Sequence, residues 1–485
     1  MPALVRRLFR RLALVAVLGA LIGAAPASEP SGAAIDSAVL ANFPKNPHTS
    51  MSVSIVHDGR VVYAKGFGYR DDGTPDRFIA KDQNYYGLPF ARARSGRMKA
   101  DARTIYAIGS VSRQFTAAAI LLLNERGRLR LDDAVAEYVP DVKTPNLTLR
   151  MLLNQRSGLP DMNTLAFMQR VRPLARRSDG TFDMQRVAKE IAALPRDFAP
   201  DANFEYSTSN YFVLGAIVER VAHEPLAAFF EENILRPLGM TRTAYGKPAA
   251  VDDVAIGYRL EEGGAIRRAY PWDLAWLGGA GALTSTVEDL ARWNTALLSH
   301  RILTPASLAQ MWRGADAGRG QGSYAMGWIE DALGSHRYLW HNGEVGGFHA
   351  LNVIFPGDDL AFTLLANNQD ERPEFLLPGI AALFFPVSGL DRILPRSGKV
   401  LVEASAAVGL GALAIAVVAI ATLRRFIVGG IISALLALVL GFFLPTIAGF
   451  VWAGILALLP IAAYLAAVRF IPKVIAPPPK KARSR

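Results

Sequence analysis

The chain contains no cysteine among its 485 residues. Disulfides and cysteine-ligated metal sites are therefore excluded, and the fold must be held by its hydrophobic core. A chain of this length can bury such a core. No pair of histidines has the spacing of a zinc site, and no other zinc motif is present in the sequence. We therefore predict that the protein uses no metal and no cofactor.

Acidic residues are missing from both ends of the chain, although its formal net charge is +11. No acid precedes Glu29, and none follows Glu403. Twelve cations occupy these two ends: Arg6, Arg7, Arg10, Arg11, Arg424, Arg425, Arg469, Lys473, Lys480, Lys481, Arg483 and Arg485. Without them the chain carries a net charge of −1. The basic residues therefore indicate membrane topology, and we predict no nucleic-acid partner.

The first 27 residues have the pattern of a secretory signal peptide. The charged region runs from Arg6 to Arg11, an apolar core follows at 12–24, and Ala25-Pro26-Ala27 has the pattern of a small-residue cleavage site. The alternative is an uncleaved anchor helix, for which the apolar core is short. Either reading predicts that the body of the protein crosses a membrane.

A second apolar region runs almost without interruption from about Val402 to Phe470. A helix needs roughly 20 residues to cross the bilayer, so we predict three transmembrane helices, Val402–Leu423, Ile427–Leu444 and Ile447–Val468. The positive-inside rule then places the basic tail, residues 469–485, in the cytoplasm. Residues 28–395 would form an extracytoplasmic, periplasmic domain on a bacterial cytoplasmic membrane, with membrane lipid as a partner of the spans.

In the predicted domain, Ser110 and Arg113 stand at the start of a helix. The run Phe115–Asn124 is apolar on nearly all sides, as in a buried helix. A serine at a helix start is most often only an N-cap. The i, i+3 spacing also places Ser110 and Arg113 on one helical face, where a nucleophile and a second functional group could meet.

Two regions before this helix have local patterns of their own. The residues Met51–His57 and Arg60–Lys65 are strand-like and are joined by Asp58-Gly59, which predicts a hairpin. The segment Asp71–Lys99 is rich in arginine, glycine and aromatic residues, which predicts a loop insertion.

Four further segments give the Ser110 pattern a context. They are Leu147–Asp161, the run Phe204–Gly215 with Tyr206 and Thr208, the glycine-rich Gly278–Leu290, and Trp340–Phe348 with His341-Asn342-Gly343-Glu344. In order and spacing they resemble the β-lactamase-related serine hydrolases, which are similar to class C β-lactamases, penicillin-binding proteins and D-aminopeptidases. The resemblance covers about residues 45–385.

The resemblance implies an α/β (α+β) fold of the β-lactamase/transpeptidase type, in which helices flank an antiparallel sheet and a helical region is inserted. It implies that Ser110 is the nucleophile and that Tyr206 moves its proton. The N–H groups of Ser110 and Glu344 would form the oxyanion hole. Thr208, His341, Asn342 and Gly343 would bind the substrate. Taken alone, Tyr206 could be a core tyrosine and His341 an ordinary strand residue.

Two positions depart from the family pattern. Arg113 replaces the lysine of Ser-x-x-Lys, and Thr208 replaces an asparagine. An arginine stays charged and cannot serve as the base, and lost base function costs about 10²–10⁴-fold in rate. We therefore hypothesise that Arg113 assists catalysis by favouring a phenolate at Tyr206, because a nearby opposite charge can lower a pKa by about 1–3.

The sequence leaves two functions open. The first is a membrane-anchored, extracytoplasmic serine hydrolase that forms an acyl-enzyme with small peptide, amide or ester substrates, including cell-wall fragments. The second is a catalytically impaired domain of the same fold that binds a ligand or acts as a sensor. Ser110, Tyr206 and His341 favour the enzyme, whereas Arg113 and Thr208 favour the binding domain.

Overall fold

A single antiparallel sheet of nine strands forms the centre of the computed structural model, which describes residues 29–43, 48–73, 96–260, 265–269, 273–316 and 323–387. Strands from the two ends of this region are neighbours, since β1 pairs with both β2 and β14. In their order across the sheet the strands are β3 (Met98–Lys99), β2 (Arg60–Asp71), β1 (Ser50–His57), β14 (Leu360–Ala366), β13 (Phe348–Phe355), β12 (His336–Val345), β11 (Trp328–Leu333), β10 (Ser323–Ala325) and β9 (Ala315–Asp316). The predicted antiparallel sheet is therefore confirmed.

The hairpin predicted near the start of the domain is also confirmed. Strands β1 and β2 pair from Ser50↔Gly68 to His57↔Arg60. Asp58 and Gly59 between them have φ values of 49° and 71°. Positive φ at both positions is what a two-residue hairpin turn requires, and it is the reason for the Asp-Gly pair.

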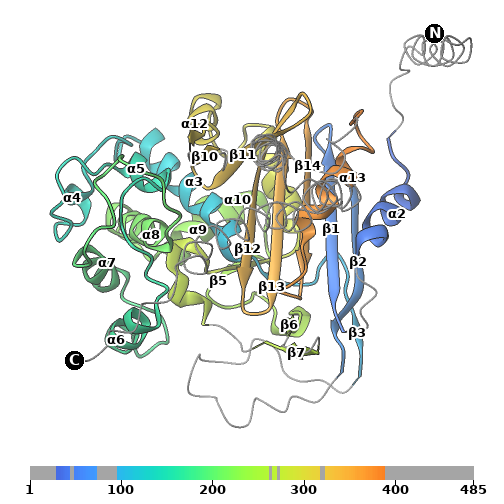
Figure 1. Ribbon diagram of the computed structural model, residues 1–485, viewed down its shortest axis with the longest axis horizontal. Coiled ribbons are helices and arrows are strands. Elements are labelled where there is room, and N and C mark those ends of the chain that lie inside the picture. The colour runs from blue at the N-terminus through green and yellow to red at the C-terminus, as the bar shows by residue number, and fades with distance from the viewer. Residues whose placement is uncertain are drawn as a thin grey trace, which may run out of the picture. The chain divides into compact units, whose positions relative to one another are not determined.

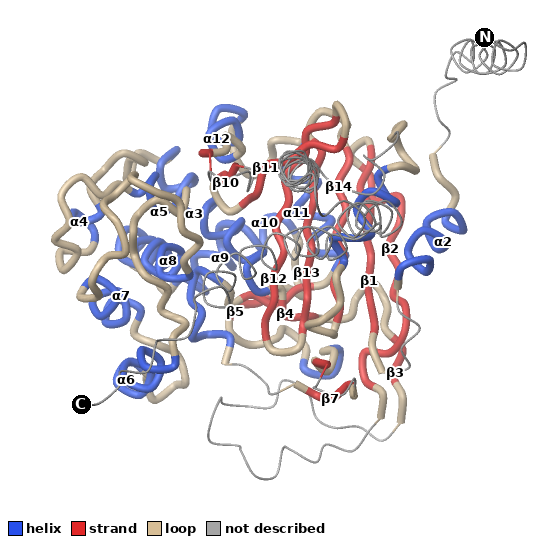
Figure 2. Tube along the Cα trace, in the orientation of Figure 1, coloured by secondary structure: helices blue, strands red, loops and turns tan. Residues whose placement is uncertain are grey.

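Helices cover both faces of the sheet (Figures 1 and 2). One face packs on α3 (Ser112–Glu125) and α11 (Val287–Leu298), and the larger hydrophobic core lies on this side. The opposite face packs on α2 (Gly32–Asn42), the turn η5 (Pro373–Leu376) and α13 (Leu377–Ala381) around a smaller core. The alternation of side chains along a strand sends successive residues to these two different cores.

A helical region joins the larger core beside the sheet (Figure 1). Its centre is α8 (Thr208–Ala222), which contacts α3, α7 and the turn η4. The remaining elements of this part are α4 (Val135–Tyr138), α5 (Leu149–Leu153), α6 (Leu165–Ala175), α7 (Met184–Ala192), α9 (Leu226–Phe230), η2 (Glu231–Leu235), α10 (Arg236–Leu238) and η4 (Leu274–Ala280). This arrangement agrees with the predicted helical insertion.

Short elements complete the described chain. They are η1 (Gly109–Val111), η3 (Val251–Asp253), α12 (Pro305–Met311), the small sheet of β4 (Tyr106–Ala107), β8 (Leu283–Ser285) and β5 (Ala244–Tyr245), and the pair β6 (Tyr258–Leu260) and β7 (Ile266–Arg268). The strand β8 follows η4 directly and leads into α11, whose N-cap Thr286 accepts a hydrogen bond from Asp289 N, as a capped helix start requires.

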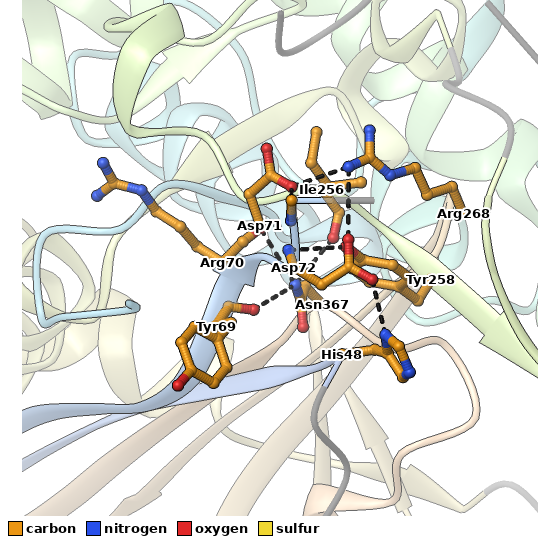
Figure 3. A network of polar contacts seen from close by, with 10 residues as sticks. His48, Tyr69, Arg70, Asp71, Asp72, Ile256, Tyr258, Arg268 and Asn367 are labelled. Carbon is orange, nitrogen blue, oxygen red and sulfur yellow. Dashed lines mark hydrogen bonds and ion pairs between the residues drawn. The ribbon is translucent and has the colours of Figure 1, made fainter. Parts of the chain in front are cut away.

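A buried polar network fixes the ends of the predicted loop insertion (Figure 3). Asp71 ends β2, and both Asp71 and the following Asp72 lie against Arg268 of β7, with a distance of 2.8 Å between Arg268 Nη2 and Asp71 Oδ1. Asp72 also pairs with His48 at 2.7 Å. The insertion is narrower than predicted, because Asp71 pairs with Met98 in the sheet. Residues 74–95 lie outside the described residues.

The predicted signal peptide (1–27), the three transmembrane helices (402–423, 427–444 and 447–468) and the basic tail (469–485) all lie outside the described residues. The described residues belong to the first of two units, residues 1–393. Within that described part, no helix is both long and apolar enough to cross a bilayer.

Candidate active site

Ser110 lies in a tight turn at the entrance to α3. The turn η1 (Gly109–Val111) is a 3-10 helix that leads directly into the α-helix, so Ser110 precedes α3 by two residues. Gly109 has a φ of 48°, which favours glycine and turns the chain so that Ser110 stays half-buried while its neighbours are buried. The predicted position at a helix start is confirmed, although no side-chain cap bond from Ser110 is found in the described structure.

The second half of β12 lies directly against this turn. A Cβ atom on Gly343 would lie 2.9 Å from Ser110 N and would overlap the carbonyl oxygen of Ile108. In the same contact, a Cβ atom on Gly109 would lie 3.1 Å from Glu344 N. Both glycines therefore allow a close approach of two backbones. The backbone nitrogens of Ser110 and Glu344, the predicted oxyanion hole, lie on the two sides of this contact.

This half of β12 has an edge that no strand of the described chain covers. Pairing with β11 ends at Ile329↔Trp340, whereas pairing with β13 continues to Val345↔Phe348. The residues His341–Val345 are therefore paired on one side only. An extended substrate could hydrogen-bond to the open side of such a strand.

Arg113 is buried in the first turn of α3, with 2% of its surface exposed. Its Nη1 donates to Ala280 O at 2.7 Å, and its Nη2 donates to Thr208 Oγ1 at 3.4 Å. The guanidinium carbon lies 4.6 Å from the centre of the Tyr206 ring, in a cation–π position. No carboxylate of the described residues forms an ion pair with it, so the charge of Arg113 acts on the polar and aromatic groups around it.

Tyr206 lies two residues before α8 and is close to both Ser110 and Arg113. The Ser110 hydroxyl lies near enough to the phenol to influence its pKa. Burial raises the pKa of Tyr206, while the charge of Arg113 and the Ser110 hydroxyl act to lower it, and the net direction is upward. The hypothesis that Arg113 lowers the pKa of Tyr206 is therefore corrected: Arg113 acts in the expected direction, but the net direction is upward, although 39% of the Tyr206 surface is exposed.

His341 is buried beneath this tyrosine, with 1% of its surface exposed. Burial and the charge of Arg113 lower the pKa of His341 to about 3, so its ring is neutral. Nδ1 lies 2.5 Å from Asn342 O, which can only accept, and Nε2 therefore accepts from the hydroxyl of Tyr324 at 3.3 Å. The ring centres of His341 and Tyr206 are 5.9 Å apart. His341 supports the Tyr206 ring, and its imidazole is too buried to meet a substrate directly.

Thr208 is held by three groups at the start of α8. Its backbone N–H donates to Asp161 Oδ2 at 3.0 Å, which places a carboxylate at the helix N-terminus. Its Oγ1 accepts from Asn163 Nδ2 at 3.0 Å and from Arg113 at 3.4 Å. The hydroxyl hydrogen of Thr208 therefore remains available to donate.

The side chain of Asn342 lies on the other face of the sheet from Ser110. It lies near enough to Glu374 of η5 to lower the pKa of that carboxyl. The side chain of Glu344 shares that face and pairs with Arg372 at 2.9 Å. The structure therefore brings Ser110, Arg113, Tyr206 and Thr208 together over His341. The backbone of Asn342, Gly343 and Glu344 borders the site, whereas the side chains of Asn342 and Glu344 lie on the other face of the sheet.

Two residues of the site had no signal in the sequence. Tyr324 lies in the three-residue strand β10, and its ring lies 6.0 Å from that of Tyr206. Asn163 follows the recognised segment that ends at Asp161 and reaches Thr208 through a turn held by its own N–H to Asp161 Oδ1 at 2.7 Å. Only the tertiary structure connects either residue to Ser110. The described residues also contain no group of three or more metal-binding side chains.

The sequence profile of the beta-lactamase family matches residues 38–383. The chain belongs to the beta-lactamase family. Among curated proteins, it is 27% identical to the protein flp of Staphylococcus aureus (strain COL) over 351 residues, which are 70% of this chain. They are 63% of the relative's own length, so the chain spans less than two thirds of that protein. The putative penicillin-binding protein PbpX of Bacillus subtilis is 26% identical over 68% of this chain and 74% of its own length.

Solved structures of the same fold include an octameric penicillin-binding protein homologue from Pyrococcus abyssi. It has a TM-score of 0.59 and 25% identity, covering 74% of this chain and 77% of its own. A D-amino acid amidase from Ochrobactrum anthropi was solved with L-phenylalanine amide. It has a TM-score of 0.57 and 22% identity, and the match covers 74% of this chain and 96% of the amidase. The resemblance stated from the sequence is thereby confirmed, together with the fold.

Proposed function

We propose that this family member is a serine hydrolase that forms an acyl-enzyme through Ser110. The observation that carries this proposal is the position of the Ser110 hydroxyl beside the phenol of Tyr206, close enough to lower its pKa, next to the open edge of β12. A nucleophile, a proton carrier and two backbone nitrogens then surround one position where a carbonyl group can bind. Small amides, peptides and esters fit this arrangement, and the amidase fold neighbour acts on the first of these classes.

A neutral Tyr206 can carry the proton without first losing its own. As the Ser110 oxygen bonds to the carbonyl carbon, the serine proton passes to the Tyr206 oxygen. The Tyr206 proton moves ahead of it, in the same step, to the leaving nitrogen or oxygen, whose bond to carbon breaks, so the phenol never holds two protons. The tyrosine is unchanged at the end of this relay, and water later releases the acyl group by the reverse route. Arg113 would stabilise the negative charge that Tyr206 bears during the transfer.

A second candidate function is ligand binding by a catalytically impaired site. It is favoured by the contacts of Arg113, whose two hydrogen bonds go to Ala280 and Thr208 and whose charge cannot accept a proton. In that case the pocket would hold a peptide or amide that is not cleaved.

The membrane location is part of the same proposal. The apolar region 402–470 and the basic residues beside it support three transmembrane helices with a cytoplasmic tail. The hydrolase domain would then face the periplasm, where cell-wall peptides are among the available amides.

Labelling of the purified full-length protein with a fluorophosphonate and a fluorescent penicillin tests the hydrolase. We expect stoichiometric fluorophosphonate labelling that Ser110→Ala abolishes and that Tyr206→Phe slows by about 10²-fold, because the relay loses its proton carrier. Tyr63→Phe, on β2, removes a phenol outside the site and serves as the control.

Two results would decide against parts of this proposal. If wild-type protein is not labelled, the binding function is supported instead. If Tyr206→Phe is labelled as fast as wild type while Ser110→Ala is not labelled, Tyr206 is not the proton carrier.

A further inference from the structure

A cluster of charged side chains lies on the face of the sheet opposite Ser110, directly behind the proposed oxyanion hole. Glu344 of β12 stands opposite His349 of β13 in the ladder, so both side chains project to the same face. Gly343, the neighbour of Glu344, projects to the other face, against the Ser110 turn. The cluster and the catalytic turn therefore contact the same two residues of β12 from opposite sides.

Arg372 joins the two strands in this cluster. Its Nη1 donates to Glu344 Oε1 at 2.9 Å and lies 3.1 Å from His349 Nδ1. His349 is buried, and its Nε2 lies 2.8 Å from Glu374 Oε1. Burial raises the pKa of Glu374, but its bond with His349 and the other contacts of the carboxyl together outweigh this, so the net direction is downward and Glu374 is a carboxylate. His349 therefore donates from Nε2 to Glu374, while its Nδ1 lies between Arg372 Nη1 and the backbone oxygen of Gln369, which is 3.3 Å away.

Asn342 shares this face of β12. Its side chain lies near enough to Glu374 to lower the pKa of that carboxyl, which bonds to His349. Asn342 and Glu344 stand on the two sides of Gly343 in the sequence. Glu344 is attached through its side chain to Arg372, in the segment that leads into η5.

This attachment lies on the part of β12 whose other edge meets no strand of the described chain. The turn that follows contains Gly346 and Gly347, with φ values of 54° and 88°. An open edge next to a glycine turn can change direction at low cost. The direction of the Glu344 N–H therefore depends on the contacts that hold the Glu344 side chain.

We propose that Arg372 is a positioning residue for the oxyanion hole: by holding Glu344 against His349, it fixes the direction of the Glu344 backbone N–H. This inference rests on the proposed hydrolase function for its catalytic consequence. Its structural part, the fixing of residues 341–347, holds for a binding site as well.

The chain offers a matched control for Arg372. Arg337 lies in β12, at the end of the strand far from Glu344, and pairs with Glu330 at 2.5 Å. Both arginine side chains are 46% exposed. Replacing either one removes a half-exposed ion pair, which by itself contributes little to stability. Only Arg372→Ala removes a contact behind the oxyanion hole.

The test uses saturation kinetics of fluorophosphonate labelling on the full-length protein. In this reaction the Ser110 oxygen bonds to phosphorus, the serine proton passes to Tyr206, and fluoride leaves with the Tyr206 proton. We expect Arg372→Ala to lower the limiting rate constant by about tenfold, less than the loss of a whole oxyanion donor. The half-saturating concentration should stay within about twofold. Arg372→Lys should recover most of the rate, and Arg337→Ala should match wild type.

Amide hydrogen exchange gives an independent measurement. Arg372→Ala should speed exchange in the peptide that contains residues 341–347 and leave residues 336–340 unchanged, whereas Arg337→Ala should not affect 341–347. If Arg372→Ala matches Arg337→Ala in both measurements, or speeds exchange throughout the sheet, the proposal is wrong. If wild type is never labelled, the hydrolase proposal fails, and the exchange of residues 341–347 alone decides the positioning role of Arg372.

Discussion

Arg113 determines how the site can work, because its charge is buried without a carboxylate partner among the described residues. A buried charge lowers stability unless hydrogen bonds or the π electrons of a nearby aromatic ring compensate for it. Here Ala280 O, Thr208 Oγ1 and the Tyr206 ring supply that compensation. The same charge lowers the pKa of His341 and opposes the rise at Tyr206. A single residue thus keeps the imidazole neutral and prepares the tyrosine for a transient negative charge.

Replacing Arg113 by lysine tests whether the site is limited by the missing base. A lysine can lose its proton when buried, so Arg113→Lys should raise the rate of Ser110 labelling by at least about tenfold. Labelling rates of wild type, Arg113→Lys and Arg113→Met are the measurement. The methionine variant keeps the bulk of the side chain but has no base, so it should be slower than wild type. Equal rates for the lysine and methionine variants would contradict this account.

The neutral ring of His341 predicts a dependence of stability on pH. Its pKa is lowered from 6.5 to about 3, so between these values the unfolded chain binds more protons than the folded one. The free energy of unfolding should therefore fall as the pH falls through this range, by up to about 1.4 kcal/mol per pH unit. Urea unfolding at several pH values should show a weaker slope for His341→Gln. His300→Gln, at an exposed histidine, is the control. An unchanged slope for His341→Gln would show that the imidazole is not held neutral.

At the level of elements, the site is made by the contact between the turn η1 and the strand β12. Neither element alone contains a complete site, since one supplies Ser110 and the other an open backbone edge. Glycines at positions 109 and 343 allow the two backbones to touch. The geometry of the oxyanion hole therefore depends on the absence of two side chains.

Adding one methyl group at this contact should disrupt the site. Gly343→Ala would place a Cβ atom 2.9 Å from Ser110 N and against Ile108 O, so η1 and β12 must separate. We expect Ser110 labelling to fall by about 10²-fold and the free energy of unfolding to fall by about 1–3 kcal/mol. Gly357→Ala is the matched control, because a Cβ atom at Gly357 meets nothing within 4 Å. Labelling of Gly343→Ala at the wild-type rate would mean that the two backbones can separate without harm to the site.

The sequence predicted those parts of the structure that local chemistry determines. The Asp58-Gly59 hairpin, the buried helix after Ser110 and the antiparallel sheet are all present. The direction of the Asn342 side chain was not predicted, because the residue types of a strand do not reveal which face meets the active site. The pKa of Tyr206 was misjudged because a neighbouring charge is visible in a motif, whereas desolvation depends on the folded surroundings. Tyr324 and Asn163 come from a three-residue strand and a turn, which carry no pattern of their own.

At the level of the whole molecule, the described domain contains its own cores. Among the described residues, both hydrophobic clusters are made of side chains between Ile35 and Val387, and all nine strands of the large sheet lie in that range. The structure thus provides a reason to expect that residues 28–393 fold without the C-terminal segment.

Deleting the residues after Ile393 should separate attachment to the membrane from chemistry at Ser110. We expect the full-length protein to stay in the membrane fraction through high-salt and alkaline washes and to be released only by detergent. Three apolar spans would anchor it far more strongly than the screened attraction of a basic tail for lipid. Residues 28–393 should be recovered without detergent and labelled at Ser110 at the full-length rate. Release of the full-length protein by salt alone would instead assign the attachment to the twelve terminal cations. A truncated protein that is soluble but no longer labelled would show that the site needs the C-terminal segment, against the independence that its self-contained cores predict.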